Sequence, residues 1–171
     1  MTEQKRLPLE FYKQPAISLA PLLLGKILCR KIGDKIIRLK ITETEAYAGE
    51  QDTACHAHKG RTPRTSVMYE EGGVTYIYLC YGIHYLLNVV AADINEPEAV
   101  LIRGLEGISG PGRLTKALQI DKSLNKLSLI DSNELWLEDG EQPAYTTTPR
   151  IGINYASEED IARPWRFVAE P

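Results

Sequence analysis

Two glutamates follow an alternating run of apolar and polar residues, and carboxylates in that position suit acid–base chemistry. From 36 to 48 the odd positions begin with isoleucine and leucine and continue with Glu43 and Glu45. Successive side chains of a strand point to opposite faces, so in a regular strand the apolar face becomes acidic here. A carboxylate beside an apolar wall has the perturbed acidity that a general base needs near neutral pH. The alternation leaves equally open a bulge or strand end that turns both glutamates outward.

Four tyrosines stand close together in a chain that is only 8% aromatic: Tyr76, Tyr78, Tyr81 and Tyr85. Tyrosine is a favourable strand residue, so packing explains most of this run. Tyr81 is the exception, because it precedes Gly82 at a predicted hairpin tip, where nothing packs behind the ring. A bulky ring at such a tip is suited to entering a base stack and filling the gap left by an extruded nucleotide.

The histidines and cysteines do not have the spacing of a metal site. His56 and His58 follow Cys55 closely, but no third ligand stands at a recognisable distance along the chain. The three cysteines are widely spaced and include no Cys-x-x-Cys pair, which argues against a disulfide framework and a zinc knuckle. We therefore expect no metal, with His56 hydrogen-bonded in a pocket and His58 solvated.

The elements that must position these residues are mostly strands. A hairpin is predicted over 26–32 and 36–48, turning at 33–34, and a second over 74–80 and 83–92, with Tyr81 and Gly82 at its tip. Further strands are predicted over 99–103, 135–138, 151–155 and a last one ending at 168.

Two helices accompany the strands. One is predicted over 14–24, with Ser18 as its N-cap and Gly25 as its stop, and the other over 113–119. The sequence thus predicts an α+β fold over 1–171: a single domain dominated by antiparallel sheet, with a few helices and a protruding β-hairpin.

The composition is that of a globular chain, with 43% hydrophobic and 25% charged residues among 171. The apolar stretch over 17–24 contains Pro21, is too short to span a bilayer, and is not preceded by a signal-peptide pattern. We therefore expect no membrane partner and a cytoplasmic location.

The net charge of −3 argues mildly against nucleic acid as a partner, but the charge is unevenly distributed. Residues 56–64 carry Lys59, Arg61 and Arg64 and no acid, whereas residues 131–141 carry five acids and neither lysine nor arginine. Acidic and basic faces are therefore expected, and a local basic patch is enough for docking on phosphates.

Several blocks in one order resemble the alkyladenine (3-methylpurine) DNA glycosylases. They are Glu43-Thr-Glu-Ala-Tyr47-Ala-Gly49, Ala54-Cys-His56, Gly60-Arg-Thr-Pro-Arg64, Tyr76-Ile-Tyr78-Leu-Cys-Tyr81-Gly82, Asn88, Val100-Leu-Ile-Arg103 and Ser109-Gly-Pro-Gly-Arg-Leu-Thr-Lys-Ala-Leu118. The similarity extends from about residue 20 to Arg163-Pro-Trp-Arg-Phe167 and so covers most of the chain.

The resemblance implies catalytic roles for three residues. Glu45 matches the general base, with Glu43 a neighbour of lesser role. Arg103 matches the arginine that, together with that glutamate and a main-chain carbonyl, holds the nucleophilic water. The carbonyl would belong to Ile151.

The resemblance also implies a base pocket and DNA contacts. Tyr47, His56 and Tyr78 match the residues that sandwich a flipped base, and Asn88 matches the amide that screens purines by their exocyclic groups. Tyr81 matches the intercalating wedge. Contacts to the DNA backbone are expected from Arg61 and Arg64, and His58 and Lys59 are assigned only to a phosphate-facing loop.

The function implied is that of a monomeric, monofunctional DNA glycosylase of base excision repair that needs no cofactor and is associated with the nucleoid when bound to DNA. It would flip alkylated or deaminated purines (3-methyladenine, 7-methylguanine, hypoxanthine, ethenoadenine) out of duplex DNA and hydrolyse the N-glycosidic bond. A non-catalytic binder of damaged bases is one alternative, and the Glu45 and Arg103 pair argues against it. A hydrolase of free nucleosides is another, but it would have no use for Tyr81 at an exposed tip.

Overall fold

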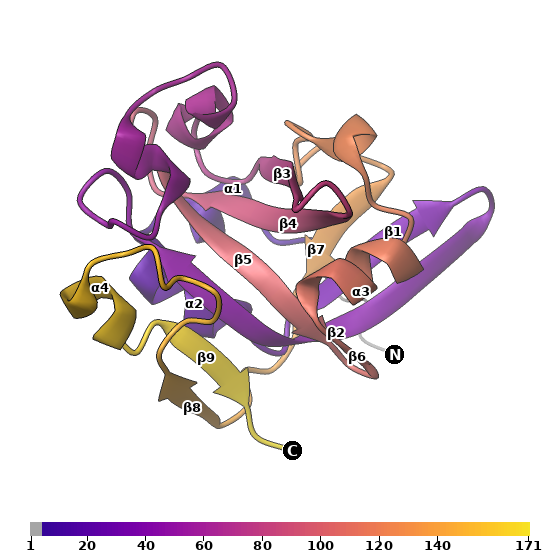
Figure 1. Cartoon of the computed structure of the whole chain (residues 1–171). Helices are drawn as coiled ribbons and strands as arrows, with labels where there is room; N and C mark the ends of the chain where they lie inside the picture. Colours follow the sequence, from indigo (N-terminus) through magenta and orange to yellow (C-terminus); the bar gives the residue numbers. More distant parts are fainter. Residues whose placement is uncertain (1–4) are drawn as a thin grey trace.

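One antiparallel sheet of nine strands organises the chain in the computed structural model, which describes residues 5–171 (Figure 1). Six strands follow one another in the order β3-β4-β5-β2-β1-β7, while β6 pairs with β5, and β9 pairs with both β2 and β8. The strands are β1 Ile27–Ile32, β2 Lys35–Tyr47, β3 Thr75–Cys80, β4 His84–Ala91, β5 Glu98–Leu105, β6 Ile108–Ser109, β7 Leu135–Glu138, β8 Tyr145–Thr148 and β9 Arg166–Ala169. In Figure 1 the β1–β2 hairpin extends away from the body at the right, and the β8–β9 pair lies at the lower left.

Short helices accompany the sheet. The α-helices are α1 Leu9–Tyr12, α2 Ala16–Leu23, α3 Pro111–Ala117 and α4 Glu158–Ala162, and three 3-10 turns are η1 His56–Lys59, η2 Thr65–Tyr69 and η3 Lys122–Leu124. The predicted α+β class, a single domain dominated by antiparallel sheet, is therefore confirmed. Residues 1–4 of the predicted domain lie outside the described residues. Within 5–171, no helix is long and apolar enough to cross a bilayer.

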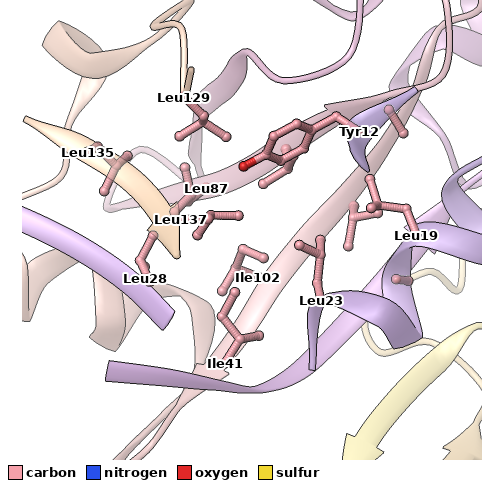
Figure 2. Packing of buried hydrophobic residues seen from close by; sticks show 14 of the residues in the cluster. Tyr12, Leu19, Leu23, Leu28, Ile41, Leu87, Ile102, Leu129, Leu135 and Leu137 are labelled. Atoms are coloured by element: carbon pink, nitrogen blue, oxygen red, sulfur yellow. The ribbon is translucent and has the colours of Figure 1, made fainter. Parts of the chain in front are cut away.

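The main hydrophobic core lies where α2 and α3 pack on the sheet, and Figure 2 shows its part around α2. Leu19 and Leu23 of α2 face Ile41 of β2 and Ile102 of β5, and all four are fully buried. Further core side chains come from β1, β4 and β7, among them Leu28, Leu87, Leu135 and Leu137. This core supports the middle of the sheet from one side and leaves the other side of β2 and β5 for the site.

A double irregularity in β2 and β5 decides which way the glutamates face. Ile41 pairs with Leu105 and Thr44 with Ile102, so each strand advances three residues between two positions on the core face. Gly104 makes this close approach possible, since a Cβ there would lie 3.0 Å from the Thr42 hydroxyl oxygen. The core face of β2 therefore changes from odd to even positions.

The expectation of a regular strand is thus wrong: the bulge turns Glu45 away from the main core, yet it does not turn this side chain into solvent. Beyond it, Thr44 and Ala46 face the core, and the Thr44 hydroxyl donates to the Ala20 carbonyl. Glu45 lies on the opposite side of the strand and is nonetheless 0% exposed. Tyr47 and the loop that carries Ile151 lie against it, since both donate hydrogen bonds to its carboxylate.

The predicted strand over 151–155 is also wrong. Gly152 has φ +75°, which interrupts an extended run, and the Ala156 amide donates to the Ile153 carbonyl in a turn. A strand of this part of the chain, β8, lies before residue 151 instead. Its side chains are mostly exposed and lack the apolar alternation that predicts a strand. Neither β8 nor α4 was predicted.

The two predicted helices exist with different starts. Helix α2 begins at Ala16 after Pro15, whose carbonyl accepts the Ser18 amide, so Ser18 is within the helix and is not its N-cap. Gly25 follows the end with φ +85°, as predicted. Helix α3 begins at Pro111, because proline at the first helical position needs no amide hydrogen bond.

Candidate active site

Glu45 is the centre of a buried polar cluster. Its Oε2 accepts the Ile151 amide at 2.7 Å, its Oε1 accepts the Tyr47 hydroxyl at 2.8 Å, and the Arg103 guanidinium stands 3.7 Å from Oε1. Burial raises the pKa of Glu45 above its ordinary value, and Arg103 and the two hydrogen bonds oppose that rise. The carboxylate is thus held in a fixed direction with the raised basicity that proton abstraction requires.

Glu43 orients the arginine of this cluster. Its Oε2 accepts the Arg103 Nε at 3.0 Å and the Arg166 Nε at 2.8 Å, and Arg166 reaches it from β9. Arg166 also donates to the Thr148 hydroxyl of β8 at 3.0 Å. The pairing of β2 with both β5 and β9 therefore brings two carboxylates and two guanidinium groups together, and Glu43 has a larger structural role than the sequence suggested.

Four residues predicted to hold a base line one pocket. Tyr47 comes from the end of β2, His56 from η1, Tyr78 from β3 and Asn88 from β4. The rest of the lining consists of Ala54, Cys55, Met68, Tyr76, Ala99 and Tyr155. The rings of His56 and Tyr78 have centroids 4.4 Å apart, and the Asn88 amide donates to the Tyr76 carbonyl at 3.2 Å. The pocket is therefore aromatic with one buried amide.

His56 is held neutral in this pocket. Burial, and to a smaller extent the positive charges of Arg64 and Lys59, together lower its pKa to about 4. Its Nδ1 lies 2.9 Å from the Tyr76 hydroxyl, which fixes the plane of the ring. At neutral pH the pocket therefore presents an uncharged imidazole.

A groove leads from the pocket to the tip of the β3–β4 hairpin. Four residues line both pocket and groove and so form the mouth: Tyr47, His56, Tyr78 and Tyr155. Tyr81, Arg103 and Ile151 line the groove beyond. The structure thus brings the predicted pocket and wedge residues together with Arg103 and Ile151 along one surface, and Glu45 is buried behind it in contact with Tyr47 and Ile151.

Tyr81 stands at the hairpin tip as the sequence predicted, and it is 88% exposed. Tyr81 and Gly82 have φ of 53° and 66°, and the Ile83 amide donates to the Cys80 carbonyl. Two successive left-handed residues give the tight reversal that a hairpin needs. The tyrosine therefore adopts an uncommon backbone conformation that projects its ring away from the sheet.

Arg61 and Arg64 are exposed and belong to the loop between η1 and η2. The Arg64 guanidinium lies 5.2 Å from the centre of the Tyr78 ring and that of Arg61 lies 5.3 Å from the Tyr69 ring. His58 is exposed, and its Nδ1 lies 2.8 Å from the Glu50 carbonyl oxygen. A role of this loop on DNA phosphates stays a prediction.

Sequence reasoning missed three residues of the site. Tyr155 lies at the mouth, and its hydroxyl donates to the Ala54 carbonyl at 2.7 Å. Arg150 and Asp52 form a buried ion pair behind Tyr47. The hydrogen bond from the Ile151 amide to Glu45 was not foreseen either, and the predicted role of the Ile151 carbonyl in holding water stays a prediction. Within residues 5–171, no group of three or more histidine, cysteine, aspartate or glutamate side chains is arranged to hold a metal ion.

Comparisons with a family model and with individual proteins point to the same family. The model of the family "Methylpurine-DNA glycosylase (MPG)" matches residues 10–171. A protein of Borreliella afzelii is 48% identical over 94% of both chains, one of Psychrobacter cryohalolentis is 44% identical over 91% of this chain and 86% of its own, and one of Methanocella arvoryzae is 43% identical over 94% and 90%. Each of the three bears the name "Putative 3-methyladenine DNA glycosylase".

The match over residues 10–171 shows the class of protein: the chain is a DNA glycosylase, and its substrate is DNA. Within that class it belongs to the methylpurine-DNA glycosylase family. The resemblance drawn from the spaced sequence blocks is thereby confirmed.

Proposed function

We propose that the chain is a monofunctional glycosylase that turns an alkylated or deaminated purine out of duplex DNA and hydrolyses its N-glycosidic bond with a water activated by Glu45. The observation that carries this proposal is that Tyr47 belongs both to the aromatic pocket and to the cluster around Glu45. Its ring lines the aromatic pocket and its hydroxyl donates to Glu45. A base held against that ring has its sugar bond directed toward the mouth, beside Glu45 and Arg103.

The chemistry follows from the charge that develops on the sugar. When the bond from C1′ to the base nitrogen breaks, its electron pair leaves with the base and C1′ becomes positively charged. The Glu45 carboxylate stabilises that charge and takes a proton from the water whose oxygen bonds to C1′. A cationic alkylated base leaves as a neutral base, whereas a neutral base such as hypoxanthine leaves as an anion and takes up a proton from solvent. The other product is an abasic site, and Glu45 returns its proton to solvent. Arg103 and the main-chain carbonyl of Ile151 are proposed to hold the water.

The pocket suits electron-poor purines. Alkylated bases such as 3-methyladenine and 7-methylguanine are cationic, and an aromatic face attracts a cation by about 0.5–2 kcal/mol. A neutral His56 does not repel such a base, whereas an imidazolium would. Asn88 is proposed to reject undamaged purines by their exocyclic groups.

Extrusion of the base is assigned to the hairpin tip. Unstacking costs a few kcal/mol and is cheapest at damaged or mismatched positions. The exposed Tyr81 ring is proposed to enter the stack in place of the base, while Arg61 and Arg64 neutralise the DNA backbone. The protein is proposed to act as a monomer.

The decisive experiment uses a labelled duplex with a single hypoxanthine, ethenoadenine or 7-methylguanine, treated with protein and then with alkali. We expect cleavage at the lesion and none at an undamaged adenine in the same place. Tight binding without cleavage would support a damage sensor instead. Hydrolysis of free inosine at a similar rate would support a nucleosidase.

A further inference from the structure

Arg150 stands directly before Ile151, the residue whose amide contacts Glu45. Its side chain is completely buried and makes four hydrogen bonds. Two go to Asp52, at 2.6 Å and 3.0 Å, in the forked geometry of an arginine–carboxylate pair. The others go to the carbonyls of Ala46 at 2.9 Å and Asp160 at 3.3 Å. One guanidinium therefore joins the end of β2, the loop after it and helix α4.

Asp52 extends this connection to the pocket. Its two oxygens also accept the amides of Ala48 at 3.0 Å and Ala54 at 3.1 Å. Those residues bracket the turn that leads from β2 to Cys55 and His56, which line the pocket. The aspartate therefore sets the shape of the segment between two base-binding side chains, Tyr47 and His56.

Arg150 also stacks against the base-binding tyrosine. Its guanidinium carbon lies 4.9 Å from the centre of the Tyr47 ring and 4.9 Å from that of Trp165. The Trp165 carbonyl in turn accepts the Ala46 amide at 2.9 Å. A planar guanidinium between two rings limits where Tyr47 can move, and an ammonium group would not fill that space in the same way.

We propose that the Arg150–Asp52 pair is a positioning device for base excision: it holds the Tyr47 ring and the Ile151 amide in fixed register with Glu45. This inference rests on the proposed function. A buried ion pair contributes little net stability compared with apolar packing, so stability is a weak reason for it. Precise positioning is a stronger reason, because a misplacement of about 1 Å in a catalytic site costs about a hundredfold in rate.

The pair also acts on the charge balance around Glu45. The groups that act on this carboxylate are Arg103 from β5, Tyr47 from β2, and Arg150 with the Ile151 amide from the loop. Glu43 and Arg166 are connected to it through Arg103. Arg150 and the Ile151 amide each lower the pKa of Glu45. Displacing them raises that pKa, so the acid limb of the pH–rate profile moves to higher pH.

The test replaces Arg150→Lys, which keeps the charge and loses the fork and the stacking. The single-turnover excision rate at saturating enzyme is measured against pH and corrected for the folded fraction. We expect a loss of about 10–100-fold, an acid limb at higher pH and unchanged affinity for duplex DNA, since Arg150 is buried. Where this variant does not fold, Asp52→Glu, which keeps the charge and shifts the carboxylate, is measured in the same way.

Glu138→Gln is the control, because it weakens the ion pair of another buried carboxylate, with the half-exposed Arg38 on β2, at the β7 edge away from the groove. It is expected to lower the melting temperature and leave both the rate per folded molecule and the acid limb unchanged. The proposal is overturned by an Arg150→Lys enzyme that behaves like this control. A wild type that forms no abasic site overturns the proposed function itself, and the role of the pair with it.

Discussion

The groove connects two regions that are built in opposite ways. At Glu45 the carboxylate is 0% exposed, and protein groups from three separate segments of the chain contact it. At the hairpin tip Tyr81 and Ile83 are 88% and 73% exposed. The side chains around Glu45 are fixed by further contacts, since Arg103 is bound by Glu43 and Tyr47 packs against Arg150. The side chains at the hairpin tip are mostly exposed, so no packing fixes them. Chemistry is assigned to the buried region and insertion into DNA to the exposed one.

This contrast separates two kinds of mutational effect. A buried carboxylate with a raised pKa is unfavourable for folding at neutral pH, so its presence points to function. An exposed ring contributes nothing to the core, so its removal affects only what it touches in a complex. Variants at the two ends should therefore differ in whether excision and binding of DNA change together.

The largest expected effect is that of Glu45→Gln. The amide keeps the volume and cannot accept the proton, so excision of hypoxanthine should fall by about 10²–10⁴-fold while duplex binding stays near wild type. Single-turnover kinetics with alkali cleavage and a binding titration measure the two quantities. Glu106→Gln, at an exposed acid of the β5–β6 turn, is the control. An active Glu45→Gln enzyme would contradict the assigned chemistry.

Tyr81→Ala should give the next largest effect, on extrusion. Base–aromatic stacking is worth about 1–3 kcal/mol, so we expect a loss of roughly tenfold or more in duplex affinity and in the rate of base flipping. Fluorescence of a 2-aminopurine next to the lesion reports flipping. The melting temperature should not change, and Ile94→Ala, which removes another exposed apolar side chain, should change neither. Equal flipping by Tyr81→Ala and the wild type would remove the wedge from the mechanism.

Asn88→Ala tests the pocket between these two regions. The amide is 4% exposed and fixed by the Tyr76 carbonyl, so its removal leaves room for the exocyclic amino group of guanine. We expect selectivity for hypoxanthine over undamaged guanine to fall by about tenfold, with excision of hypoxanthine itself less affected. Competition between the two bases in one duplex measures the ratio. An unchanged ratio would assign the screening of purines to other groups.

The hairpins and the strand over 135–138 were predictable because their signals are local. A glycine turn or an apolar run of a few residues determines each of them. The orientation of Glu45 could not be predicted, because the alternation of β2 is interrupted by a bulge that depends on Gly104 of β5. From the sequence, only the similarity of these blocks to a known family distinguishes Glu45 from Glu43.

The Arg150–Asp52 pair shows a second limit of sequence reasoning. Its members are 98 residues apart, and nothing around either residue indicates burial. The error over 151–155 has a related origin, since the alternating apolar residues there resemble a strand while Gly152 adopts a left-handed conformation. Residues that act through long-range contacts are therefore the ones that sequence patterns miss.

The smallest expected effect concerns His56 and acid stability. Its pKa is about 4 in the folded protein and about 6.5 when unfolded, so the unfolded chain binds more protons between these values. His56 therefore destabilises the protein as the pH falls from 6.5 to 4, and His56→Gln should not show that loss. We expect the wild type to lose about 5 °C more in melting temperature over this range than His56→Gln. The exposed His58→Gln is the control and should follow the wild type, and parallel melting of all three proteins would mean that the imidazole is not held neutral by the pocket.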